Sequence, residues 1–143
     1  MPQPQLTASE VEFEVSLEPD EFPDGEVFHT DNDEADRETE ALIRLRLERG
    51  QTEAWCSVVV TAKYEGPLAP SGLQGHASLG GVNLFDDSAI RSGDQVDREV
   101  KRYAREEGLY GEALDALNEN LLKHIEQARR IVAAADEWKP RRS

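Results

Sequence analysis

The sequence predicts an α+β fold, in which an antiparallel sheet of three to four strands packs against a long C-terminal helix, with a second, shorter helix. Near the N-terminus, apolar and polar residues alternate with a period of two, which is typical of half-buried strands. The run from Glu53 to Tyr64 is β-branched and apolar on both parities, which is typical of a central strand. From Ser92 onward, apolar residues recur at helical spacing. With 143 residues, we expect a single domain over 1–143 with one core.

The first strand is predicted over 11–17, where Val11, Phe13, Val15 and Leu17 alternate with acidic or small polar residues. A long acidic connection, 19–40, follows and is interrupted by proline and glycine. Connections of this length are often functional or disordered, so this one is a candidate for a mobile segment. Within it, residues 33–40 contain no glycine or proline and are compatible with a helix.

A second strand is predicted over 43–47, where three apolar residues alternate with charged ones. The sequence RGQT at 49–52 then predicts the hairpin turn that leads into the central strand, 53–64. A loop is expected over 66–72, which holds two prolines and two glycines, and a fourth, edge strand over 73–79.

Two helices are predicted in the second half of the chain. Ser92 and Gln95 resemble a capping box, and Gly108 stands where the first of these helices would end. The last helix is marked by one apolar stripe over six turns, which we expect to lie across one face of the sheet. Pro140 prevents its continuation, and 139–143 form a basic tail. The stripe comprises Leu114, Leu117, Leu121, Ile125, Ala128, Val132 and Ala135.

The charge of the chain is strongly asymmetric. The net charge is −14, and residues 1–40 hold fourteen acidic residues and one basic residue, whereas 41–143 hold sixteen and fifteen. A charge run of this kind is often only a solvated segment that aids solubility. The alternative is an anionic surface that meets a basic protein surface. The predicted partner-binding residues are Asp20, Glu21, Asp24, Glu26, Asp31, Asp33, Glu34 and Asp36.

The sequence predicts no metal site, cofactor or direct contact with nucleic acid. His29, Asp31 and Asp33 have the residue types of a cation site. An EF-hand loop starting at Asp31 fails, because Asp36 stands where glycine is needed and Leu42 where the bidentate glutamate is needed. Basic residues cluster near the C-terminus but face a strongly negative remainder, which disfavours nucleic acid as a ligand.

The stretch LQGHASLGGVNLFDD, Leu73 to Asp87, holds residue types that are common in catalytic sites. Its glycines and serine do not have the G-x-S-x-G spacing of a nucleophile elbow, and no GK[ST] of a P-loop is present. A strand that ends in a Gly-Gly turn is the preferred interpretation. The enzymatic alternative is a small enzyme or ligand-binding domain with a site around His76, Ser78, Asp86 and Asp87.

The expected location is the cytoplasm, with no membrane partner. No apolar run approaches the roughly 20 residues that span a bilayer. The N-terminus has neither the basic nor the apolar region of a signal peptide. The single cysteine, Cys56, fits a reducing compartment.

A motif pattern runs from Arg37 to Gly81. R-E-x-E-x-x-I-x-x-x-L-x-x-G is followed by a W-x-x-V-x-V strand and then by a G-x-x-x-L-G segment. The residues that carry it are Arg37, Glu38, Glu40, Ile43, Leu47, Gly50, Trp55, Val58, Val60, Gly75, Leu79 and Gly80.

This pattern resembles small uncharacterised acidic proteins of phages, prophages and plasmids. The resemblance implies a mobile-element origin and carries no particular activity. Combined with the acidic N-terminal quarter, it predicts a non-enzymatic inhibitor, acting in the host cell cytoplasm, that blocks a host nucleic-acid-binding defence complex of the CRISPR or restriction type by mimicking DNA. The remaining alternative is a virion or assembly component that forms an oligomer through the long helix or an open sheet edge.

Overall fold

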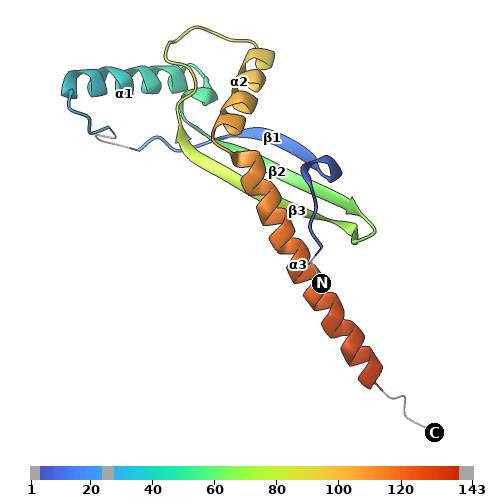
Figure 1. Ribbon diagram of the computed structural model, residues 1–143. Helices are drawn as coiled ribbons and strands as arrows, with labels where there is room; N and C mark the ends of the chain where they lie inside the picture. The colour runs from blue at the N-terminus through green and yellow to red at the C-terminus, as the bar shows by residue number, and fades with distance from the viewer. Residues whose placement is uncertain (1–3, 24–27, 139–143) are drawn as a thin grey trace.

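The computed structural model describes residues 4–23 and 28–138, and it confirms the α+β fold (Figure 1). The sheet is antiparallel, with three strands in the order β1-β2-β3. The strands are β1 (Glu12–Pro19), β2 (Cys56–Gly66) and β3 (Ala69–Val82). The α-helices are α1 (Asp33–Glu48), α2 (Gly93–Glu106) and α3 (Leu109–Glu137), and the 3₁₀ turns are η1 (Ala8–Glu10) and η2 (Thr52–Ala54).

Strand β2 is central, as its apolar composition predicts, and β1 and β3 are the edges. Val15 of β1 lies opposite Val60 of β2, which lies opposite Ala77 of β3, and Val60 is fully buried. Side chains of this parity form the inner face of the sheet, and α3 covers that face (Figure 1). The main core is Leu6, Cys56, Val58, Val60, Ala62, Ala77, Val82, Leu84, Val100, Ala104, Leu109, Ala113, Leu117 and Leu121.

The backbones of β3 and α3 come into direct contact at Gly75. A Cβ atom added to Gly75 would lie 2.2 Å from the backbone nitrogen of Leu117 and 2.6 Å from the carbonyl oxygen of Ala113. Glycine is therefore required here because the helix crosses the strand without space for a side chain. The first glycine of the GHASLGG segment thus serves packing.

Helices α2 and α3 follow the predicted signals. The Ser92 hydroxyl accepts a hydrogen bond from the Gln95 N–H at 3.2 Å, and the Gln95 side chain accepts one from the Ser92 N–H at 2.9 Å. This reciprocal capping box starts α2. Gly108, with φ +72°, separates α2 from α3 in the left-handed conformation that glycine adopts readily.

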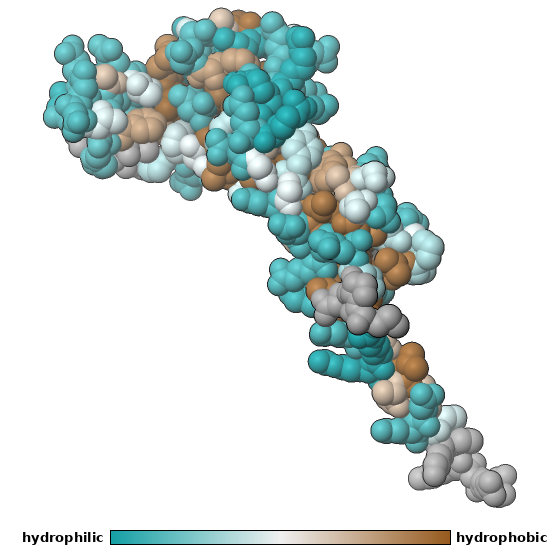
Figure 2. Space-filling model, viewed as in Figure 1, coloured by the Kyte–Doolittle hydropathy of each residue, from teal (hydrophilic) through white to brown (hydrophobic). Residues whose placement is uncertain are grey.

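Helix α3 is longer than the sheet that it covers. Its side chains are buried as far as Leu121, Ile125 is partly buried, and the following turns are exposed. The prediction that the apolar stripe lies across the sheet is therefore right for the first half of the helix and wrong for the second. We call residues 122–138 the projecting end, which extends away from the body of the molecule (Figure 1) and shows apolar surface between polar side chains (Figure 2).

The strand predicted over 43–47 is wrong, because α1 continues without a break to Glu48. Ile43 and Arg46 are buried on one side of this helix, whereas Leu45 is exposed on the other. Five alternating residues fit either period, and the helix-forming composition between Asp33 and Glu48 decides for the helix. The RGQT hairpin turn is also wrong, since this segment ends α1 and leads into η2.

The loop predicted over 66–72 is shorter in the structure. Strands β2 and β3 form a hairpin with Gly66 paired to Ala69, so only Pro67 and Leu68 lie outside the strands. Pro70 is tolerated within β3 because β3 is an edge strand, where one missing N–H need not disrupt the ladder.

Candidate functional site

Some carboxylates of the acidic segment 20–40 accept hydrogen bonds from the segment itself. The Asp36 side chain is buried and accepts hydrogen bonds from the Thr30 N–H at 2.8 Å and the Thr30 hydroxyl at 2.6 Å. The buried Glu40 side chain accepts one from the Phe28 N–H at 2.9 Å. These bonds fold residues 28–32 back onto the start of α1. We call the described residues of the segment 20–40 the acidic arm.

Aromatic contacts join the acidic arm to the body. The Phe22 and Phe28 rings pack edge-on against Trp55, with centroid distances of 4.8 and 6.2 Å. Together with Ile43 and Ala54, Trp55 forms a small second core beneath α1. At the start of the arm, the Asp20 carboxylate accepts a hydrogen bond from the Gly81 N–H at 2.8 Å, which ties it to the end of β3. These contacts therefore attach the described residues of the arm to the body of the protein.

Arg46, a fully buried arginine of α1, joins this helix to the segment that follows β3. Arg46 donates hydrogen bonds to the side-chain oxygen of Gln51 at 3.0 Å and of Asn83 at 2.9 Å. It also donates to the carbonyl oxygens of Leu84 at 2.7 Å and Phe85 at 2.9 Å. Burial lowers the pKa of Arg46, because the guanidinium is removed from water. The segment after β3 thus supplies three of the four acceptors that hold α1 in place.

Other carboxylates of the acidic arm face solvent. Asp20 and Asp36, both predicted to bind a partner, use their carboxylates inside the chain, whereas Asp24 and Glu26 lie outside the described residues. Across the described part of the chain, no member of the solvent-facing set forms an ion pair. The solvent-facing set is Glu21, Asp31, Asp33, Glu34 and Glu38.

The start of α1 gives part of this acidity a structural reason. The Asn32 side chain caps the helix by accepting a hydrogen bond from the Ala35 N–H at 3.0 Å. Acidic residues in the first turn also stabilise a helix through its dipole, and α1 has three there. Glu38 lies one turn beyond this region, where the dipole effect has fallen off. Glu38 is not among the predicted partner-binding residues, although its spacing of four residues from Glu34 places both carboxylates on one side of the helix and is a signal that could identify it.

The outer face of the sheet is a second acidic surface, and none of the described helices covers it. Glu12, Glu14 and Glu18 of β1 are exposed there. Glu14 forms an ion pair with Lys63 of β2. The hydrogen bond from Lys63 lowers the pKa of Glu14 and raises that of the lysine. This face therefore extends the acidic character of the N-terminal quarter onto the sheet edge.

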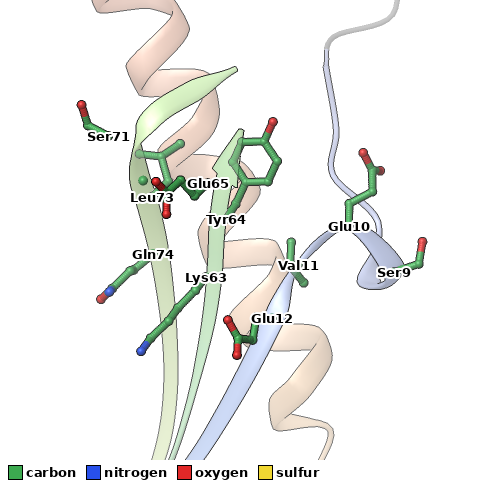
Figure 3. Close-up of a pocket in the computed structure, with 11 residues that line it drawn as sticks. Ser9, Glu10, Val11, Glu12, Lys63, Tyr64, Glu65, Ser71, Leu73 and Gln74 are labelled. Carbon is green, nitrogen blue, oxygen red and sulfur yellow. The ribbon is translucent and has the colours of Figure 1, made fainter. Parts of the chain in front are cut away.

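A polar groove of about 620 Å³ lies at one end of this face, between η1 and the β2–β3 hairpin (Figure 3). Glu12, Lys63 and Gln74 are directly paired across the three strands and line it in one row. Ser9 and Glu10 of η1 form its opposite wall. The groove thus presents carboxylates and one ammonium to solvent, and its described lining contains neither histidine nor cysteine.

The residues of the enzymatic alternative lie on different parts of the fold. His76 and Ser78 are exposed on the outer face of β3, and the His76 Nδ1 lies 3.0 Å from the hydroxyl of Thr61. Asp86 and Asp87 belong to the connection between β3 and α2, where Asp87 forms an ion pair with Arg91 at 3.0 Å. Among the described residues, no hydrogen bond or ion pair joins the two pairs.

Cys56 is buried, and its thiol is expected to be unreactive in the folded protein. Burial raises the pKa of Cys56 to about 12, and the Glu53 and Asp20 carboxylates add to this shift. We expect no reaction with a disulfide reagent at neutral pH until the protein is unfolded, when one thiol should react. Spectrophotometric titration before and after adding denaturant measures this, and rapid reaction of the folded protein would contradict the burial.

Among residues 4–23 and 28–138, no group of three or more His, Cys, Asp or Glu side chains is arranged to hold a metal ion. In the same residues, no helix has the length and apolar character needed to cross a membrane. Comparisons with protein-family models, with curated proteins and with solved structures find no match to this chain. Function is therefore inferred from the residues and their arrangement.

Proposed function

We propose that this chain is a non-enzymatic interaction protein that binds a basic surface of a partner protein through its acidic arm. The observation that carries the proposal is that the carboxylates of the arm fall into two groups, those that form hydrogen bonds within the chain and those that face solvent. Asp20, Asp36 and Glu40 form the hydrogen bonds that fold the arm. The solvent-facing set is left without an ion pair in the described chain, and a folded segment holds it in position.

The spacing of these carboxylates suits a partner that binds nucleic acid. Glu34 and Glu38 are four residues apart on α1, which corresponds to about 6 Å along the helix axis. Each strand of duplex DNA carries one phosphate per roughly 3.4 Å of axis, so the two carboxylates match about every second phosphate. Held on a folded arm, such groups can occupy Lys and Arg sites at a low entropic cost.

The finer proposal is that the partner is a host nucleic-acid-binding defence complex of the CRISPR or restriction type, blocked by mimicry of DNA in the host cytoplasm. Its support is the resemblance of residues 37–81 to acidic proteins of mobile elements, together with the exposed carboxylates. The steering of a cationic partner by such a surface also predicts fast, salt-sensitive association.

Neutralising four solvent-facing carboxylates of the arm should abolish binding to the partner. Immobilised protein would be incubated with nuclease-treated bacterial lysate at about 50 mM and about 200 mM salt, and the retained proteins identified by mass spectrometry. We expect retention of nucleic-acid-binding proteins that falls steeply with salt and is competed by duplex DNA. The variant carries Asp31→Asn, Asp33→Asn, Glu34→Gln and Glu38→Gln.

A matched control removes the same amount of charge elsewhere. The four acidic residues that the control neutralises are exposed on or beside α2 and α3. None of them forms an ion pair within the described chain. The control should bind like the parent protein, and circular dichroism should show that both variants keep their helices. Equal binding by the parent and the arm variant would overturn the proposal, as would loss of binding in the control. The control carries Glu107→Gln, Asp115→Asn, Glu126→Gln and Glu137→Gln.

A further inference from the structure

The projecting end of α3 carries an apolar groove that no described part of the chain covers. The groove has a volume of about 390 Å³ and is lined by one face of the helix, with Leu68 of the β2–β3 turn at its inner end. Val132 is 59% exposed and Leu68 is 41% exposed, which is unusual for large apolar side chains that line one groove on a small domain. The helical residues that line it are His124, Ile125, Ala128, Arg129, Val132, Ala133 and Asp136.

Opposite charges flank this face at a distance that prevents them from pairing within one chain. Arg129 and Asp136 both line the groove, are exposed, and form no ion pair with any described residue. They are seven residues apart, which is about 10 Å along the helix axis. Neither charge therefore has a partner among the described residues, and a second molecule can supply one.

We propose that the projecting ends of two copies of this chain pair antiparallel through this face. A two-fold axis between Val132 and Ala133 places Arg129 of each copy opposite Asp136 of the other. The dimer then contains two Arg129–Asp136 pairs. The same register sets Val132 of one copy against Ala133 of the other. A large side chain opposite a small one allows close packing of two helices. The inference is independent of the acidic arm, which is remote from this face.

The expected dimer is weak. The exposed part of α3 offers only about four turns, which buries less than the roughly 1,200 Å² of a standard interface. We therefore expect a dissociation constant on the order of 10–100 μM. Sedimentation velocity of the full chain from about 5 to about 500 μM should show a shift from monomer to dimer across this range.

Charge exchange tests the register directly. Arg129→Glu alone and Asp136→Arg alone should each raise the dissociation constant at least about tenfold, because like charges then face each other twice. An equimolar mixture of the two variants should regain dimerisation, since a mixed dimer of one Arg129→Glu chain and one Asp136→Arg chain again sets opposite charges against each other at both contacts. An antiparallel arrangement with position 129 opposite position 136 predicts both the loss in each single variant and the rescue in the mixture. In a parallel arrangement the parent would already set like charges against each other, so the single variants would dimerise no more weakly than the parent.

Matched controls lie on the same helix. Arg130→Glu and Glu137→Arg have the same spacing but do not line the groove, so they should dimerise like the parent. The variant with the neutralised acidic arm should also dimerise normally, which separates this inference from the proposed function. A parent protein that stays monomeric up to about 500 μM would overturn the inference, and so would a mixture that fails to dimerise. A different protein seated on this face would appear as the first of these outcomes.

Discussion

Arg46→Met should lower the free energy of unfolding by about 3–5 kcal/mol, a large part of the stability of a domain of this size. The substitution removes the donors that four oxygen atoms of Gln51, Asn83, Leu84 and Phe85 now share. Each buried acceptor left without a partner costs about 1–3 kcal/mol before the site relaxes. Urea unfolding measures the loss, followed by circular dichroism and by tryptophan fluorescence.

Two comparisons make the Arg46 result specific. Arg46→Lys keeps the charge but not the fork of donors, so it should recover less than half of the loss. Arg105→Met removes an exposed arginine of α2 and should change stability by less than about 0.5 kcal/mol. A background of Trp138→Phe leaves Trp55, beneath α1, as the only tryptophan reporter. An Arg46→Met protein as stable as the parent would contradict the burial of this side chain.

The second large effect is expected at Gly75. Gly75→Ala should destabilise the protein by about 3 kcal/mol or more, at the upper end of the range for overpacked cores. The new methyl group would meet backbone atoms of α3, at 2.2 Å from the Leu117 nitrogen, and backbone yields less readily than a side chain. The helix would have to move off the inner face of the sheet. Thermal and urea unfolding measure the change.

The matched control is a glycine in α3 itself. Nothing lies within 4 Å of a Cβ atom added to Gly111, and this residue is helical. Gly111→Ala should therefore stabilise the protein by about 0.5–1 kcal/mol, the opposite sign to Gly75→Ala. If both substitutions change stability by similar small amounts, the close approach of β3 and α3 is wrong.

The sequence predicts those parts of the fold whose patterns are long or chemically specific. The β2 run is assigned by its β-branched composition, and the apolar stripe of α3 extends over enough turns to make its helical period clear. The Ser92–Gln95 capping box fixes the start of α2 by a local hydrogen-bond pattern. By contrast, the alternation over 43–47 is too short to separate a strand from a helix, and the strand that it predicts lies within α1.

The division of the acidic arm could not be predicted, because it depends on contacts made by folding. Asp36 and Glu40 are as acidic in sequence as Glu34 and Glu38, yet they bond to Thr30 and to the Phe28 N–H. Likewise, an arginine within a charged helix normally indicates a solvent-facing position. Arg46 is buried because carbonyl oxygens from 84–85, far along the chain, surround it. Periodicity carries no information on such pairings.

The direct contact between the backbones of β3 and α3 sets the direction in which the long helix leaves the body. The acidic arm and the projecting end lie at opposite ends of the molecule (Figure 1). Two copies joined at their projecting ends would therefore display their arms outward on a rigid spacer. A target with two basic sites at a matching separation would be held by both arms at once, so that release requires two simultaneous dissociation events and the residence time becomes much longer than that of one arm.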